Sequence, residues 1–165
     1  MLKTLTGMLC ALLLSLWTLP AATQDLLRIS EPSKLDLQYM LQQRRYLSDL
    51  TERHYGQGFI GNRDADLALL QRLLDDGLVT GTQALQAMGV IMGDLLAEEY
   101  RLHWVIYEDQ LGRSRALRYR ETDNYLFPIT MISRRREVDN QTPVTEIYDK
   151  AAAEIGAAIP PLPFQ

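Results

Sequence analysis

The sequence has almost no cysteine. The 165-residue chain holds one, Cys10, near the N-terminus. A single cysteine cannot form an intrachain disulfide, and the segment that contains it is predicted to be removed. The working protein therefore has neither a disulfide nor a cysteine nucleophile, and its fold depends on its hydrophobic core.

Hydrophobic runs long enough to span a bilayer are also absent. The longest, Leu9 to Leu19, is too short, and no second one follows. Lys3 precedes this run and small residues around Ala21 follow it, which is the three-part pattern of a secretory signal. We predict that residues 1–24 are a cleavable signal peptide and that the mature protein is periplasmic or secreted, with no transmembrane segment. An uncleaved membrane anchor is the alternative.

The chain has no excess of positive charge. It holds 17 basic and 21 acidic residues, for a net charge of −4. Loss of Lys3 with the signal makes the mature protein more negative still. This balance argues against nucleic acid as a partner.

Motifs of catalysis and metal binding are missing as well. The two histidines, His54 and His103, are far apart and belong to no HExxH pattern, so neither a metal nor another cofactor is expected. There is no GxSxG or SxxK for a serine nucleophile. His54 is predicted to lie at a helix C-terminus, where a protonated imidazole is favoured.

Three stretches of the N-terminal half show helical hydrophobic periodicity. The first runs from Ser33 to Gly56, and the second is predicted to be capped by Asp64 and to end at Gly77. The third, residues 84–97, is apolar nearly all round, which is typical of a buried central helix.

Two glycines interrupt that third helix. Gly89 and Gly93 each cost about 1 kcal/mol relative to alanine in a helix interior. Close approach of another part of the chain is the usual reason for keeping them, and we predict such an approach here.

The C-terminal half begins with residues typical of strands. Residues 102–107 and 116–120 predict a hairpin, and a third strand is predicted from about Phe127 to Arg135. A final helix is predicted to open at Thr142-Pro143, before a proline-rich tail over 159–165. The predicted fold is one α+β domain over 25–158, with three N-terminal helices, a three-stranded antiparallel meander and a C-terminal helix.

Asp94 is the only charge within the apolar helix, and a buried carboxylate must be paired or neutralised. Glu98 lies one turn further on, and His103 is within reach in the expected fold. These three are the candidates for an acid/base site. The alternative is a structural carboxylate that fixes the helix against the sheet.

Arginines concentrate in one region of the sequence. Seven of the fourteen lie between Arg113 and Arg136, on or around the predicted meander. Arginine suits carboxylate and phosphate recognition, so Arg118, Arg120 and Arg134 are candidates for binding an acidic protein or an anionic envelope component. The alternative is that these charges protect strand edges from pairing.

Several short motifs together resemble a known family. They are Met88-Gly89-Val90-Ile91-Met92-Gly93-Asp94, Leu102-His103-Trp104-Val105, Asp109-Gln110-Leu111-Gly112, Leu126-Phe127-Pro128-Ile129 and Ile132-Ser133-Arg134-Arg135. In this order they resemble the bacterial domain-of-unknown-function family 3806. The resemblance implies that Gly89, Gly93, Asp94, Trp104 and Pro128 define the domain, and it implies no reaction.

Three functions follow as hypotheses. The first is a non-enzymatic periplasmic binding or interaction domain, such as an inhibitor or immunity-type protein. The second is a hydrolase of cell-wall or glycan material that uses Asp94 with Glu98. The third is a small-ligand carrier with a pocket between the third helix and the sheet, lined by Trp104 and Tyr107.

Overall fold

Five α-helices and a four-stranded antiparallel sheet make up residues 27–159, the part of the chain that this computed structural model describes. The predicted signal peptide and nearly all of the proline-rich tail lie outside the described residues. The elements are β1 (Arg28–Ser30), α1 (Lys34–Tyr55), α2 (Arg63–Asp75), α3 (Thr82–Tyr100), β2 (Leu102–Asp109), β3 (Gly112–Tyr119), β4 (Tyr125–Leu126), the short 3-10 helix η1 (Pro128–Thr130), α4 (Met131–Arg136) and α5 (Val144–Ala158). The α+β class predicted from the sequence is confirmed.

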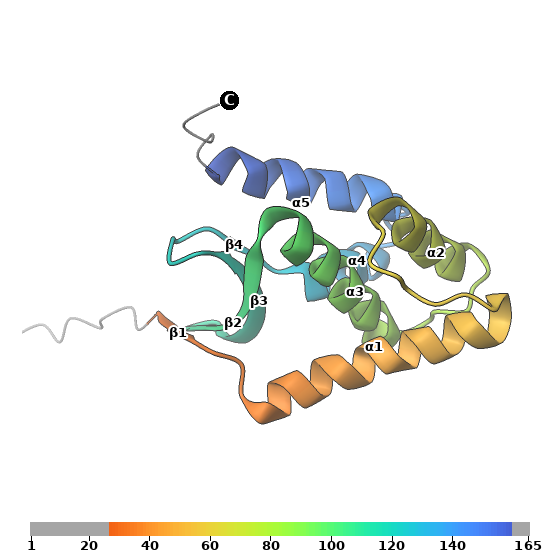
Figure 1. Cartoon of the computed structure of the whole chain (residues 1–165), viewed down its shortest axis with the longest axis horizontal. Coiled ribbons are helices and arrows are strands. Elements are labelled where there is room, and N and C mark those ends of the chain that lie inside the picture. The colour runs from red at the N-terminus through yellow and green to blue at the C-terminus, as the bar shows by residue number, and fades with distance from the viewer. Residues whose placement is uncertain (1–26, 160–165) are drawn as a thin grey trace, which may run out of the picture.

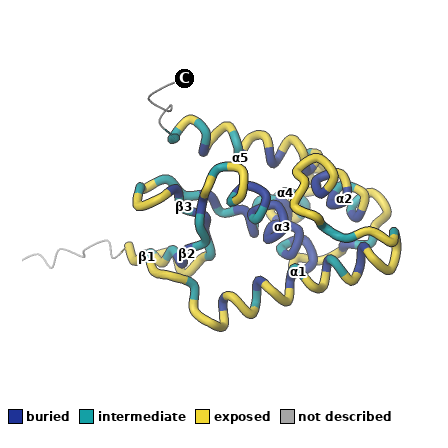
Figure 2. The backbone as a smooth tube through the Cα atoms, viewed as in Figure 1, coloured by how far each residue is buried: buried dark blue, intermediate teal, exposed yellow. Residues whose placement is uncertain are grey.

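Helix α3 is the centre of the molecule. It packs against α1, α2, α4, α5, η1 and two strands of the sheet. Figure 1 shows α3 between α1 on one side and α5 on the other. Its residues are buried on almost every side (Figure 2), as its continuous apolar pattern predicts.

The two glycines of α3 mark the predicted close approach. A Cβ added at Gly89 would lie 2.5 Å from the backbone oxygens of Pro128 and Ile129. A Cβ added at Gly93 would lie 2.6 Å from the Trp104 ring and 2.7 Å from Pro128. Both glycines are therefore needed because η1 and the Trp104 ring sit directly on the helix backbone.

The helix starts follow local hydrogen bonding. Ser33 caps α1, and its hydroxyl accepts a hydrogen bond from the Asp36 backbone N–H while the Asp36 carboxylate accepts from the Ser33 N–H. The predicted cap of α2 is wrong by two residues, because Asn62 and not Asp64 accepts the bond from Ala65 N–H. Asp64 is already inside the first turn.

The sheet has the order β1-β2-β3-β4. The predicted hairpin is present as β2 and β3, with Asp109 opposite Gly112 next to the turn and Leu102 opposite Tyr119 at the far end. Its predicted bounds are wrong, because β3 begins at Gly112, four residues before the predicted start at Ala116. Strand β1, which pairs with β2, was not predicted because its three residues are too short to show a period.

The predicted third strand over Phe127 to Arg135 is wrong. Only Tyr125 and Leu126, before that stretch, pair with β3, and the chain then turns into η1 and α4. Pro128 stands at the first position of η1, where its missing N–H is no loss. Three residues of this segment are buried at helical spacing: Ile129, Ile132 and Ser133. Packing against α3 at Gly89 and Gly93 therefore outweighs the strand preference of the local sequence.

Candidate functional site

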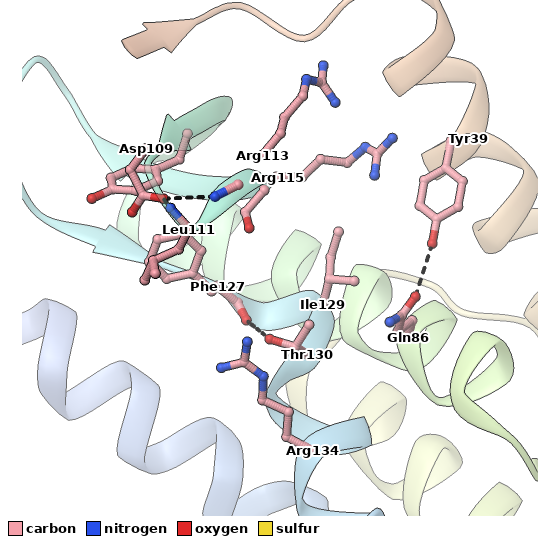
Figure 3. Close-up of a pocket in the computed structure, with 13 residues that line it drawn as sticks. Tyr39, Gln86, Asp109, Leu111, Arg113, Arg115, Phe127, Ile129, Thr130 and Arg134 are labelled. Carbon is pink, nitrogen blue, oxygen red and sulfur yellow. Dashed lines mark hydrogen bonds between the residues drawn. The ribbon is translucent and has the colours of Figure 1, made fainter. Parts of the chain in front are cut away.

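A pocket lies where β3 runs on beyond the end of β4, and we call it the edge pocket. It has a volume of about 550 Å³. Figure 3 shows β3 on one side and the segment from Phe127 to Arg134 on the other, with α1 and α3 contributing one residue each. The lining residues are Tyr39, Gln86, Tyr107, Asp109, Leu111, Gly112, Arg113, Ser114, Arg115, Phe127, Ile129, Thr130 and Arg134.

Two of the three arginines of this pocket share one carboxylate. Arg113 donates two hydrogen bonds to Asp36, at 2.6 and 2.9 Å, and Arg115 Nη2 lies 2.9 Å from Asp36 Oδ1. Asp36 is 2% exposed, and the hydrogen bonds from Arg113 hold the pKa of its carboxyl well below the usual range against the opposing effect of burial. One negative charge thus faces two positive ones.

Arg115 also stacks on an aromatic ring. Its guanidinium carbon lies 4.2 Å from the centroid of the Tyr39 ring. The Tyr39 hydroxyl is directed at Gln86 of α3 (Figure 3). The Nε of Arg115 is buried and has no hydrogen-bond partner within residues 27–159. This arginine is therefore fixed in place with donor capacity left over.

Arg134 is the third arginine of the edge pocket. It is exposed, comes from α4 and extends towards Phe127 and Thr130 (Figure 3). Within the described part of the chain it makes no hydrogen bond or ion pair. Next to it the Tyr107 ring meets two other rings edge-on, with centroid distances of 5.2 Å to Phe127 and 5.1 Å to Tyr125. A free cation therefore stands beside an aromatic wall.

The other two predicted binding arginines lie elsewhere. Arg118 donates from Nε to the Thr122 carbonyl at 2.7 Å and from Nη1 to Glu121 at 2.9 Å, so two of its nitrogens bind the turn that follows β3. Arg120 has a left-handed backbone, with φ of 48°, and its guanidinium stacks on its neighbour Tyr119. Neither residue lines the edge pocket with Arg134.

Asp94 is held by α1 and by β2. Its two carboxylate oxygens accept hydrogen bonds from Arg44, at 2.6 and 2.7 Å, and Oδ1 accepts a further one from the Trp104 indole at 3.1 Å. The side chain is 34% exposed and lines a second hollow together with Glu98 and Arg44. A carboxylate held by a bidentate arginine pair and an indole N–H suits a structural tie between α1, α3 and the sheet.

His103, Trp104 and Tyr107 divide between the two faces of β2. Trp104 packs on Gly93 with the core, whereas His103 and Tyr107 lie on the opposite face because side chains alternate along a strand. His103 stands opposite Arg118 in the ladder and is not a hydrogen-bond partner of Asp94. Trp104 and Tyr107 therefore do not face one common space. His54 is exposed in the last turn of α1.

Sequence reasoning missed the residues that build the edge pocket around Arg134. Asp36 and Tyr39 lie on α1, 77 and 76 positions from the arginines that they contact. A signal was present, since Ser33 followed three residues later by Asp36 is a capping pattern that keeps the carboxylate near the helix start. Nothing local, however, indicates that Arg113 and Arg115 reach it.

Residues 27–159 contain neither a cluster of metal-ligating side chains nor a membrane-spanning helix. Histidines, aspartates and glutamates nowhere gather in threes in a way that could hold a metal ion. None of the helices in the same range combines the length and apolar character needed to cross a bilayer.

Comparisons with other proteins place the chain in a family. A search of curated proteins gives no match. Among solved structures, a crystal structure from Bacteroides thetaiotaomicron VPI-5482 at 1.50 Å resolution is similar over 76% of this chain, with a TM-score of 0.68 and 15% identity. The likeness shows a shared fold, and it spans 47% of that longer chain. The model of one family, described as "Domain of unknown function (DUF3806)", matches residues 66–148, a stretch that contains α3, the hairpin, η1 and α4. The chain belongs to this family of domains of unknown function.

Proposed function

We propose that the protein is an exported, non-enzymatic binding domain that holds an anionic group of its ligand at Arg134 in the edge pocket. The observation that carries the proposal is an arginine that has no hydrogen-bond or ion-pair partner among residues 27–159, beside two others that share the Asp36 carboxylate. The expected export rests on the signal pattern of residues 1–24.

The charges around the edge pocket favour an anion. Three arginines line it, and the carboxylates close to them are Asp36, Asp109 and Glu108, which stands opposite Arg113 in the sheet and, on its other side, opposite Arg28 of β1. Asp109 accepts hydrogen bonds from the backbone N–H groups of Leu111 and Gly112 in the hairpin turn. With Arg28 counted, four arginines stand near these three carboxylates, which leaves one positive charge in excess in a chain whose net charge is −4.

The shape and chemistry of the walls favour binding over catalysis. Tyr107 and Phe127 offer apolar contact, and Thr130 and Gln86 offer hydrogen-bonding groups. No nucleophile with an adjacent base stands among the lining residues. An acidic protein or an anionic envelope component are the ligand classes that this chemistry would recognise.

An NMR titration tests the proposal. The ¹⁵N-labelled mature chain is titrated with inorganic phosphate and, separately, with a hexaglutamate peptide. We expect saturable shifts, and their loss in Arg134→Glu, for the amides of the lining residues Gly112, Arg113, Ser114, Arg115, Phe127, Ile129, Thr130 and Arg134.

Arg120→Glu is the matched control, because it makes the same charge change on an exposed arginine outside the pocket. Its binding should stay within about twofold of the wild type, since screened surface charges at a distance contribute little. Equal loss in both variants, or shifts centred away from the edge pocket, would refute the proposal.

A further inference from the structure

We propose that the ligand of the edge pocket is an extended acidic segment of a partner protein, which pairs with the open edge of β3 as a fifth strand. This inference rests on the proposed function and names the class of partner. It follows from the hydrogen-bonding pattern of β3, the charges beside it and the sequence outside the described residues.

Part of β3 has no strand on its outer edge. Strand β4 pairs with Leu117 and Arg118 only, and the chain then leaves the sheet as η1. Within residues 27–159 the sheet order is β1-β2-β3-β4, so no other strand covers the stretch from Gly112 to Ala116. The edge pocket lies along this stretch.

The direction of the backbone groups follows from the alternation of an antiparallel ladder. Tyr119 N–H donates to the Asn124 carbonyl on the β4 side of β3. Residues two apart point their N–H and C=O groups to the same side, so those of Arg113 and Arg115 also point to the outer edge. Ser114 between them points to β2, where it stands opposite Tyr107. The backbone N–H and C=O groups of Arg113 and Arg115 are therefore available for hydrogen bonds to an added strand.

The arginines determine which strand fits. A residue paired directly opposite Arg113 or Arg115 presents its side chain on the same face as that arginine. Among residues 27–159 Asp36 is the ion-pair partner of both arginines, and only Arg113 also has an acidic residue, Glu108, opposite it, so acidic residues two apart would add to their pairing. The residue between them would lie on the other face, towards Ser114 and the Tyr107 ring. The pattern is acid, apolar, acid, with Arg134 beside it.

The chain itself does not supply such a segment. Outside the described residues its only charged side chains are Lys3 and Asp25. A second copy paired edge to edge would bring the arginines of two β3 strands against one another, and like charges in such positions repel. An acidic segment of a different protein is the occupant that the charges select.

The test uses two synthetic peptides of identical charge. One is acetyl-Val-Glu-Val-Glu-Val-amide, and the other carries N-methyl groups on both glutamate nitrogens, which removes the two donors that would face β3. We expect the first to slow amide hydrogen exchange at Arg113 and Arg115 and not at Ser114. The second should bind roughly tenfold more weakly or worse, because two hydrogen bonds are lost.

The outcomes separate the inference from the proposed function. If phosphate and both peptides bind equally well and Arg134→Glu abolishes all three, the anion pocket stands and strand addition is wrong. If none of the three binds, the proposed function fails as well. Slow exchange of Arg113 and Arg115 in the free protein, or a dimer in sedimentation that the peptide dissociates, would show another occupant and overturn the inference.

Discussion

At the scale of single residues, two glycines set how closely α3 meets the rest of the fold. Gly89 touches the backbone of Pro128 and Ile129, and Gly93 touches Pro128 and the Trp104 ring. Asp94 then binds the indole of the same tryptophan. The residues that resemble the family pattern thus meet in one place, around the start of η1.

Gly89→Ala should destabilise the protein by about 1–3 kcal/mol, because the new methyl group overlaps backbone atoms that cannot rotate away. The helix-propensity gain of about 1 kcal/mol offsets only part of this cost. Gly156→Ala on α5 is the control, since its Cβ would lie 3.8 Å from the nearest atom, on Tyr100. That variant should be as stable as the wild type or more so. Urea unfolding measures both, and a stabilised Gly89→Ala would show that the contact is looser than described.

Asp36 is the buried charge with the largest role in the edge pocket. It closes the cap of α1 and pairs with two arginines of β3, so it joins the helix start to the sheet. Its folded-state pKa lies well below the ordinary value because of the Arg113 hydrogen bonds. The ionised form is therefore the one that stabilises the fold.

Asp36→Asn should lower the free energy of unfolding by about 2 kcal/mol near neutral pH. An unfolded Asp has a pKa of about 3.9, so this contribution is complete above about pH 5 and is lost as pH falls towards the depressed folded-state pKa. The difference between wild type and variant should therefore shrink below about pH 4. Asp49→Asn, an exposed change on the same helix, should have little effect at any pH. If the difference in the free energy of unfolding between wild type and Asp36→Asn stayed constant in acid, the lowered pKa of Asp36 would be contradicted.

At the scale of elements, the helix starts and the segment after β4 show what local sequence can encode. Helix α1 is capped by Ser33, where its helical pattern begins, whereas the cap of α2 lies two residues before the predicted Asp64. Asn62 and Asp64 are both good capping residues, so propensity alone does not choose between them. The backbone conformation decides which residue is the cap. Gly61 has a left-handed φ of 77° at the end of the preceding loop, and the helix begins directly after it, with Asn62 as its cap.

Asn62→Ala should cost about 1 kcal/mol, because the N–H of Ala65 loses its side-chain acceptor. Asp64→Asn should change stability by less than about 0.5 kcal/mol, since its ion pair with Arg63 is solvent-exposed. Thermal unfolding followed by circular dichroism distinguishes the two. A larger loss of stability in Asp64→Asn than in Asn62→Ala would show that Asp64 is the cap.

The segment after β4 shows where a strand prediction fails. Residues 127–135 contain aromatic and β-branched side chains, and these favour a strand on local grounds. In the structure Ile129 and Ile132 contribute to the core from η1 and α4, close to α3. A strand would alternate its side chains and bury only every second one. The position of α3 therefore decides this element, and it leaves the β3 edge open.

At the scale of the whole molecule, α3 connects the helices to the sheet in one core. The buried cluster includes residues of α1, α2, α3, β2, β3 and α5. No cysteine follows residue 24, so this core stands without a crosslink. Such an arrangement is expected to unfold as a single unit.

Trp104 is the sole tryptophan after residue 24 and contacts α3 directly. In urea, its fluorescence and the far-ultraviolet circular dichroism of the helices should therefore change with the same midpoint, and a reducing agent should not shift it. Two separate midpoints would mean that α1 and α2 unfold independently of the sheet.

The sequence by itself determined the elements whose hydrophobic pattern extends over many residues: the three N-terminal helices, the hairpin and the C-terminal helix. It also predicted the contact at Gly89 and Gly93 and the family, because these depend on neighbouring residues. Only the tertiary structure decided that Arg113 and Arg115 pair with Asp36 and that Asp94 pairs with Arg44. It also decided that Arg134 has no hydrogen-bond or ion-pair partner in the part of the chain that is described. Pairing between residues 50 and 77 positions apart depends on how the whole chain closes around α3. The local hydrophobic periodicity of the sequence does not predict which distant residues the folded chain brings together.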